Sequence, residues 1–170
     1  PRAFTESVIR EMSTGVERPI ILPLTNPTAL SEATPEDLLE WTGGRALIAT
    51  GSPFAPVVHA GVEHVIGQAN NAFVFPGIGL GTIAVRASRV SDGMLSAAAD
   101  AVVAMTDVSS PGSSLLPDVE RLRDVSIAVA VAVAHQAIAE GIARTPQENV
   151  EAAVRAAIWE PVYRPVIASN

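Results

Sequence analysis

The stretch IILPLTNPT, residues 20–28, joins an apolar run of strand length to a polar corner at Asn26, which Pro27 makes rigid. The same pattern returns after the apolar residues 46–49, where the corner is GSPF, residues 51–54. Continuous apolar runs of this length are typical of parallel strands that are buried on both faces. In open α/β sheets, ligands bind at the corners that follow the carboxyl ends of such strands.

A helix is predicted between these two strands, and a shorter one over residues 5–12. Thr34 provides the N-cap of the helix between the strands, and a glycine pair at 43–44 ends it. The order strand, helix, strand predicts that residues 20–24 and 46–50 are parallel neighbours in one sheet. Both polar corners would then lie on the same edge of that sheet.

The rest of the sequence predicts a loop followed by helices. Prolines and glycines interrupt residues 51–71, which we interpret as a loop. Residues 129–134 alternate with period two, as a strand would, but both alternating sets are apolar. The unbroken segment around them is too long for a typical strand, which favours a buried helix. We expect helices at residues 76–88, 91–105, 124–143 and 147–158, the second of them capped at Ser91 and Asp92.

These elements predict an α/β fold class. The expected architecture is a partial Rossmann-like, three-layer α/β/α parallel sheet followed by C-terminal helices. A chain of 170 residues has the length of one domain. Within it, residues 1–75 would form half of a Rossmann unit with the site loops, and residues 76–170 would be mainly helical with an irregular tail.

Composition excludes several classes of partner and of chemistry. The net charge of −7 argues against binding to nucleic acid, and the absence of cysteine excludes disulfides and thiolate chemistry. The longest strictly apolar stretch, residues 127–134, is much shorter than a membrane span. Because the first residues carry no hydrophobic signal core, we expect a cytoplasmic protein. All 11 basic residues are arginine, so this chain alone cannot supply a lysine base.

Polar side chains at the corners are the candidate ligand contacts. Asn70 and Asn71 precede an apolar run and a helix start at Pro76, so they either contact a ligand or cap that helix. Asn26 suits a ligand contact or ordinary turn chemistry. Gly51 either leaves room for a ligand or belongs to a plain loop.

Two further patterns are interpreted as structural. The segment GIGLG, residues 77–81, lacks the spacing of a dinucleotide-binding loop, and we expect a helix face that lets a neighbouring helix pack closely. The three histidines, His59, His64 and His135, are too scattered in the sequence to predict a metal site.

Four segments of the chain together resemble the C-terminal part of malic enzymes. They are FTESVIREM (4–12), RPIILPLTNPTALSEATPEDLLEWTGGRALIATGSPF (18–54), QANNAFVFPGIGLGTIAVRASRVSDGML (68–95) and WEPVYRP (159–165). The likeness runs over nearly the whole chain and is nearest to the NAD-preferring bacterial and mitochondrial enzymes.

This resemblance implies an activity and a set of site residues. Malic enzymes oxidise and decarboxylate L-malate to pyruvate, using NAD or NADP and Mg²⁺ or Mn²⁺. By correspondence, Asn26, Asn70 and Asn71 are expected to bind the substrate, and Asn26, Gly51 and Ser52 the cofactor. Fixed amide donors can orient the two carboxylates of malate without adding a competing charge.

Other parts of the family's machinery have no match in this sequence. These are the general-acid tyrosine, to which Tyr163 does not correspond, the general-base lysine, the acidic metal ligands and the glycine-rich dinucleotide loop. We therefore expect the C-terminal piece of a longer enzyme, inactive on malate alone, with the rest of that polypeptide as its partner. The resemblance also implies a homo-oligomer, and the composition argues against a nucleic acid or membrane partner. The alternative is a non-catalytic Rossmann-like module for binding or assembly.

Overall fold

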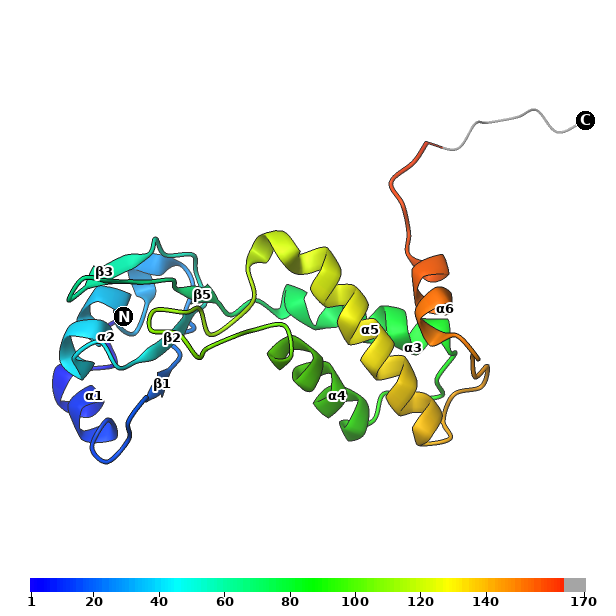
Figure 1. The fold of residues 1–170 in the computed structure, drawn as a ribbon, viewed down its shortest axis with the longest axis horizontal. Coiled ribbons are helices and arrows are strands. Elements are labelled where there is room, and N and C mark those ends of the chain that lie inside the picture. Colours follow the sequence, from blue (N-terminus) through cyan, green and yellow to red (C-terminus); the bar gives the residue numbers. More distant parts are fainter. Residues whose placement is uncertain (164–170) are drawn as a thin grey trace, which may run out of the picture.

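The computed structural model describes residues 1–163, which form an elongated body with a sheet at one end and helices at the other. Figure 1 shows the sheet-containing part with strands β1, β2 and β5 beside helices α1 and α2, and the helical part with α3 to α6. Residues 158–163 follow the last helix as irregular chain. The remainder of the predicted C-terminal tail lies outside the described residues.

Three short parallel strands form the sheet, in the order β1-β2-β5. Their bounds are Ile20–Ile21 for β1, Leu47–Thr50 for β2 and Gly67–Gln68 for β5. Ile20 pairs with Leu47 and Ile21 with Ile48, which confirms that the two predicted strands are parallel neighbours. β1 is shorter than predicted because Pro23 has no N–H group to donate to the ladder.

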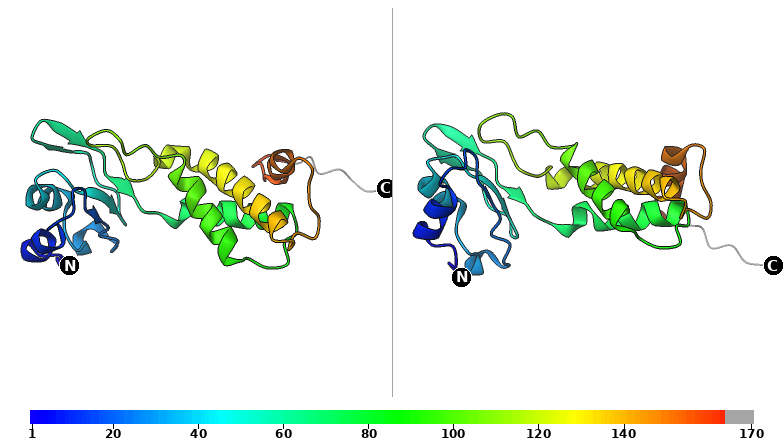
Figure 2. Two further views of the ribbon diagram at one scale, coloured as in Figure 1. Left: turned by 60° about the horizontal axis from the view of Figure 1, so that its bottom comes forward. Right: turned by 90° about the horizontal axis from the view of Figure 1, so that it is seen from below.

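Helices α1 (Glu6–Met12) and α2 (Pro35–Thr42) pack on this sheet, and a short 3₁₀ turn, η1 (Thr28–Leu30), follows β1. The hydroxyl of Thr34 accepts a hydrogen bond from the N–H of Asp37 at 3.2 Å, so the predicted N-cap of α2 is confirmed. The core beneath the two helices consists of Ile9, Ile21, Ala33, Leu38, Leu39, Ala46 and Ile48. Figure 2 shows both helices lying on one side of the strands.

The prediction of a loop over residues 51–71 was wrong. This segment contains the antiparallel hairpin of β3 (Val57–His59) and β4 (Val62–His64), and it also contains β5. The hairpin turns at Ala60 and Gly61, which both adopt positive φ angles (49° and 80°). Two-residue turns of this kind match the twist of the paired strands. The prolines and glycines of this segment therefore mark the boundaries of short strands.

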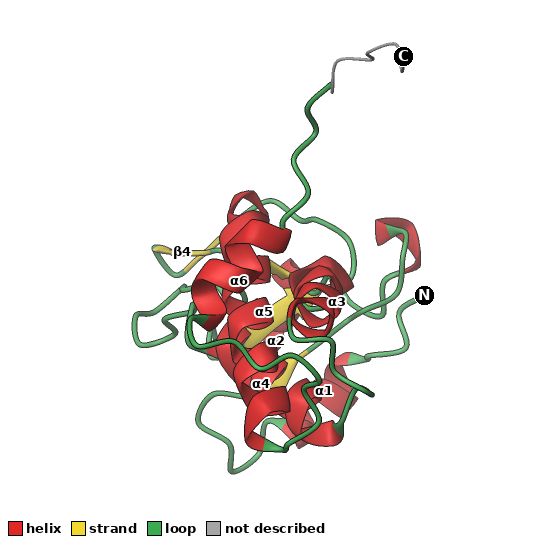
Figure 3. Cartoon of the chain, turned by 90° about the vertical axis from the view of Figure 1, so that its right-hand side faces the viewer, coloured by secondary structure: helices red, strands yellow, loops and turns green. Residues whose placement is uncertain are grey.

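The second part of the chain is helical, as predicted, and α5 is its central element. Its elements are η2 (Asn71–Phe73), α3 (Phe75–Ala84), α4 (Asp92–Val103), η3 (Val119–Arg121), α5 (Leu122–Ala139) and α6 (Val150–Ala157). The period-two segment lies inside α5, which confirms the interpretation as a helix. In the end-on view of Figure 3, α3, α4 and α6 surround α5. The fold class is therefore α/β, with a parallel sheet followed by helices.

Glycines of α3 face α5 at very short range. A Cβ atom on Gly77 would lie 2.6 Å from the Cβ of Val129, and one on Gly81 would lie 2.4 Å from the carbonyl oxygen of Ala130. Contacts below about 3 Å do not occur for real Cβ atoms, so only glycine fits. The segment GIGLG is thus a packing face of a helix, as predicted.

The segment Val119–Ala139 is long and apolar enough, by length and composition, to cross a membrane. In this structure α5 is the core helix of the helical part, and one of its faces is fully buried against α3 and α4. The buried residues of α5 are Val125, Val129, Ala130, Val133, Ala134 and Ala137. We therefore interpret α5 as the centre of a folded helical core.

The loop between α4 and η3 returns to the sheet-containing part and ties the two ends of the body together. The guanidinium of Arg18 donates to the carbonyl of Val108 at 2.8 Å, and the N–H of Val65 donates to the carbonyl of Gly112 at 2.9 Å. Gly112 has φ +80°, and a Cβ there would lie 2.1 Å from the carbonyl oxygen of Glu63. The loop thus lies against the hairpin.

Candidate functional site

The carboxyl ends of the three parallel strands bring the predicted corners to one edge of the sheet. The ladder continues one step beyond the strands, because the N–H of Gly51 donates to the carbonyl of Pro23 at 3.0 Å. The N–H of Ala69 likewise donates to the carbonyl of Thr50 at 2.8 Å. The corners after β1, β2 and β5 are therefore direct neighbours, as expected at the ligand edge of an open α/β sheet.

Asn26 and Ser52 meet at this edge, although 26 positions separate them in the sequence. The hydroxyl of Ser52 donates a hydrogen bond to Oδ1 of Asn26. Ser52 is buried and Asn26 is exposed. Below them, the hydroxyl of Thr50 donates to the main-chain carbonyl of Ser52 at 2.7 Å. The exposed amide of Asn26 is therefore held by a hydrogen bond from a buried side chain, whose residue is itself hydrogen-bonded to Thr50 through its main-chain carbonyl.

Gly51 lets the first two corners approach each other. A Cβ atom at this position would lie 2.1 Å from the carbonyl oxygen of Leu24 and 2.6 Å from its carbonyl carbon. Because both atoms belong to the main chain, no side-chain rotation could relieve the clash. The structure gives Gly51 a packing role, and contact with a cofactor at this residue stays a prediction.

Asn70 caps the short helix η2, and Asn71 is its first residue. Oδ1 of Asn70 accepts a hydrogen bond from the N–H of Ala72 at 2.9 Å, so this residue is a cap, although of η2 and not of α3, the helix that includes Pro76. Asn71 is exposed, and its side chain makes no hydrogen bond within the described part of the chain. The two amides are therefore not equivalent, and Asn71 is the one whose donors and acceptor both remain available to a ligand.

The side-chain amides of Asn26 and Asn70 are oriented in the same way relative to the fold. In each, Oδ1 accepts a hydrogen bond from the fold, and Nδ2 has no partner among residues 1–163. An amide whose oxygen is engaged offers two N–H donors to a ligand. The edge therefore presents neutral donors, which suit carboxylate and carbonyl oxygens.

Glu32 fixes the chain on the other side of Asn26 and was missed by sequence reasoning. Its carboxylate accepts from the hydroxyl of Thr25 at 2.6 Å and from the N–H of Thr25 at 3.2 Å. The hydrogen bond from the Thr25 hydroxyl is the main cause that lowers the pKa of Glu32. The two residues are seven positions apart and follow no local motif, so no sequence signal pointed to the pair.

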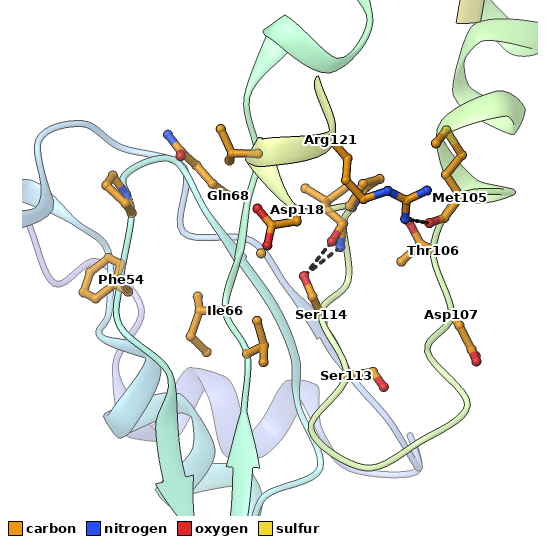
Figure 4. A pocket seen from close by; sticks show the side chains of 16 residues that line it. Phe54, Ile66, Gln68, Met105, Thr106, Asp107, Ser113, Ser114, Asp118 and Arg121 are labelled. Carbon is orange, nitrogen blue, oxygen red and sulfur yellow. Dashed lines mark hydrogen bonds between the residues drawn. The ribbon is translucent and has the colours of Figure 1, made fainter. Parts of the chain in front are cut away.

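Two hollows adjoin the corners. The first, of about 400 Å³, lies between the chain after Ser52, strand β5 and the loop that returns to the sheet (Figure 4). Its polar lining includes Gln68, Asp118 and Arg121, and the guanidinium of Arg121 donates to the carbonyl of Met105 at 3.5 Å. It could not be predicted from the sequence, because one wall is the returning loop.

The second hollow, of about 430 Å³, has Asn70 and Asn71 in its lining. Its remaining surface is almost entirely apolar and includes Phe73, Val102 and Val103. An apolar hollow with a few fixed polar groups is the usual form of a small-molecule site. The asparagine pair therefore stands where such a ligand would be oriented.

A metal ion needs several oxygen or nitrogen ligands close together. Within residues 1–163, no three histidine or acidic side chains are arranged to hold an ion. His59 and His64 face each other across the hairpin with ring centroids 6.4 Å apart. Burial, and to a lesser extent the neighbouring His59, lowers the pKa of His64. The described residues thus do not form the ligand set of a Mg²⁺ or Mn²⁺ site.

Comparison with known proteins shows which family the chain is similar to. The family model described as "Malic enzyme, NAD binding domain" matches residues 1–138. NAD-dependent malic enzyme 3 of Bacillus subtilis is 56% identical over 166 residues, which cover 98% of this chain and 29% of that relative. The NAD-dependent malic enzyme of Pseudomonas aeruginosa is 50% identical over 163 residues, covering 95% of this chain and 29% of that relative.

The solved structures that this chain resembles are also malic enzymes. A malic enzyme from Pyrococcus horikoshii superimposes with a TM-score of 0.73 at 30% identity, over 92% of this chain and 32% of that one. A malic enzyme from Entamoeba histolytica gives a TM-score of 0.73 at 26% identity, over 92% of this chain and 29% of that one. The chain thus spans about 29% of the length of the curated relatives that it matches.

Proposed function

This chain belongs to the malic enzyme family, and we propose that it forms the substrate-facing and NAD-facing edge of an enzyme that oxidises and decarboxylates L-malate to pyruvate. The observation that carries this proposal is the meeting of Asn26 with Ser52 on the same edge as Asn70 and Asn71. That edge offers neutral hydrogen-bond donors beside an apolar hollow.

The proposed role of these residues is to hold the substrate in a reactive orientation. Malate carries two carboxylates, and the N–H groups of Asn26, Asn70 and Asn71 would donate to their oxygens. Fixed neutral donors orient a dianion without the charge neutralisation that an arginine would bring. NAD, when bound, would accept the hydride from the hydroxyl-bearing carbon of malate.

The groups that move protons are proposed to come from outside this chain. It contains no lysine, and its described residues form no metal-ligand set. On the family resemblance we propose that the complete enzyme uses Mg²⁺ or Mn²⁺, held by ligands elsewhere in the longer polypeptide. NAD is proposed over NADP because the relatives named above are NAD-dependent. A cytoplasmic location and a homo-oligomeric assembly belong to the same proposal.

Asn26→Asp in the full-length enzyme tests the proposed role of this edge. The change keeps an oxygen for the hydroxyl of Ser52 and replaces the outward NH₂ by a charged oxygen. Carboxylates of malate would then meet a like charge, and we expect kcat/KM for malate to fall by about two decades, or roughly 2.7 kcal/mol. The measurement is NADH formation from L-malate and NAD in the presence of Mn²⁺.

The control variant is Asn149→Asp, which makes the same substitution at the asparagine that caps α6, in the helical part of the chain. It should leave the malate kinetics unchanged. Full activity of Asn26→Asp would refute the proposed substrate contact. If the wild-type enzyme produced neither NADH nor pyruvate from malate, the alternative of a non-catalytic module would be favoured instead.

A further inference from the structure

We propose that Ser52 is a positioning residue: it holds the amide of Asn26 so that both N–H groups face the ligand edge. This inference rests on the proposed function, since the ligand that Asn26 would contact is the substrate or cofactor named there. It assigns to Ser52 a role through Asn26, in place of direct contact with the cofactor.

The burial of Ser52 is the first argument for this role. Its exposed fraction is 5%, so its side chain has little surface to offer a ligand. Its carbonyl is engaged by the hydroxyl of Thr50, which is fully buried. A buried hydroxyl requires a hydrogen-bond partner, and within residues 1–163 the partner of the Ser52 hydroxyl is Oδ1 of Asn26.

The chemistry of the amide then fixes its orientation. A carboxamide has an acceptor at Oδ1 and two donors at Nδ2. When Oδ1 points inward to the hydroxyl of Ser52, Nδ2 must point away from it. In the flipped orientation the buried hydroxyl could only accept, and its proton would lose its partner, which is costly for a buried group. Ser52 therefore selects one of the two orientations of Asn26.

Asn70 provides an independent comparison at the same edge. Its Oδ1 accepts from the main-chain N–H of Ala72, a group that can only donate. This amide is therefore also held with its NH₂ group free of the fold. Two corners of the same sheet edge, after β1 and after β5, thus use different internal donors to hold their amides in the same orientation. The ligand group they select is one that only accepts, such as a carboxylate or a carboxamide oxygen.

The test uses three variants of Ser52 in the full-length enzyme, assayed with L-malate, NAD and Mn²⁺. Ser52→Ala removes the donor, Ser52→Cys keeps a similar volume with a poor donor, and Ser52→Thr keeps the hydroxyl. We expect the Ala and Cys variants to lose about tenfold in kcat/KM, as for one lost hydrogen bond. The Thr variant should recover most of the activity. Denaturation midpoints of all three identify any variant that fails to fold.

A double-mutant cycle with Asn26→Ala separates positioning from direct contact. If Ser52 acts through Asn26, then Ser52→Ala should have less than about a twofold effect once Asn26 is already alanine. Losses that multiply would overturn the inference, because they would show that Ser52 contributes by another route.

A readout that does not depend on turnover keeps this inference separate from the proposed function. In full-length protein labelled with nitrogen-15 asparagine, the side-chain NH₂ signals of Asn26 are identified by their loss in Asn26→Ala. We expect a single, restricted pair of signals in wild type and in Ser52→Thr, and averaged or broadened signals in Ser52→Ala. Unchanged signals in Ser52→Ala would overturn the inference even if malate is oxidised. Changed signals in a protein inactive on malate would overturn only the proposed function.

Discussion

Asn71→Ala in the full-length enzyme should lower the use of malate much more than it lowers stability. Asn71 is exposed and its side chain makes no hydrogen bond within the described residues, so its truncation breaks no hydrogen bond of the fold. Exposed substitutions of this kind usually change stability by less than about 0.5 kcal/mol. A hydrogen bond from its amide to a carboxylate of malate would be worth about 1.5–3 kcal/mol. The expected loss in kcat/KM is therefore about one to two decades.

The neighbouring Asn70 gives the contrasting result. Its Oδ1 caps η2 through the N–H of Ala72, so Asn70→Ala should lower both the malate kinetics and the stability, the latter by about 1 kcal/mol. Asn149→Ala is the matched control, because Oδ1 of Asn149 accepts from the N–H of Ala152 at the same distance of 2.9 Å, at the start of α6. Asn149→Ala should lower the stability and leave the malate kinetics unchanged.

The assay combines steady-state formation of NADH with a denaturation midpoint, measured on the same preparations of all three variants. Wild-type values of kcat and KM in Asn71→Ala would refute the reasoning, because the exposed amide would then have no ligand to contact. A large drop in the midpoint of Asn71→Ala would also count against it, since that would reveal a role in the fold.

Two further predictions concern packing and pH. Gly81→Ala should destabilise the protein by about 1–3 kcal/mol, because its Cβ would lie 2.4 Å from the carbonyl oxygen of Ala130. Gly79→Ala on the same helix, with no atom within 4 Å, should be neutral or stabilising by up to about 1 kcal/mol, and equal midpoints for the two variants would contradict the packing. The lowered pKa of Glu32 predicts stabilisation that is present above its ordinary pKa and lost as the pH falls through the lowered value. Since Glu32 is only partly buried and solvent screens its carboxylate, Glu32→Gln should cost only about 0.5 kcal/mol at neutral pH and nothing in acid, and a loss that persisted in acid would exclude the ionised carboxylate as its cause.

Local signals explain the parts of the fold that the sequence predicted well. The caps of α2 and α4 follow from Thr34 and Ser91, whose hydroxyls accept from N–H groups three residues later. The parallel pairing of β1 with β2 follows from the helix between them, because a right-handed crossover leaves one arrangement. In both cases the information lies within a short stretch of chain.

The parts that were missed have no recognisable signal in the sequence. The hairpin of β3 and β4 has strands of three residues, too short for an alternating pattern, and its turn at Ala60 and Gly61 lacks an Asn-Gly or Asp-Gly pair. The pair of Thr25 and Glu32 and the cleft beneath the returning loop likewise exist only once the chain has folded. Sequence spacing carries no information about such contacts.

The candidate site was predicted only in part. The sequence located each corner, because a polar residue after an apolar strand is a local signal. The orientation of Asn26 was not predictable, because the group that fixes it lies 26 positions away in the sequence, whereas Asn70 is held by a local capping hydrogen bond. For Asn26 that group is Ser52, in the corner after the neighbouring strand β2, and for Asn70 it is the N–H of Ala72 in η2.

This arrangement has a consequence for binding. Because the fold already engages Oδ1 of Asn26 and of Asn70, neither amide must be reoriented when a ligand arrives. Side chains that are held in their bound orientation lose less conformational entropy on binding, and the hydrogen bonds they make are correspondingly more favourable. The close approach of the chain at Gly51 contributes in the same way, since it fixes the distance between the first two corners. The donor polarity of the edge is thus a property of the folded chain before any ligand is present.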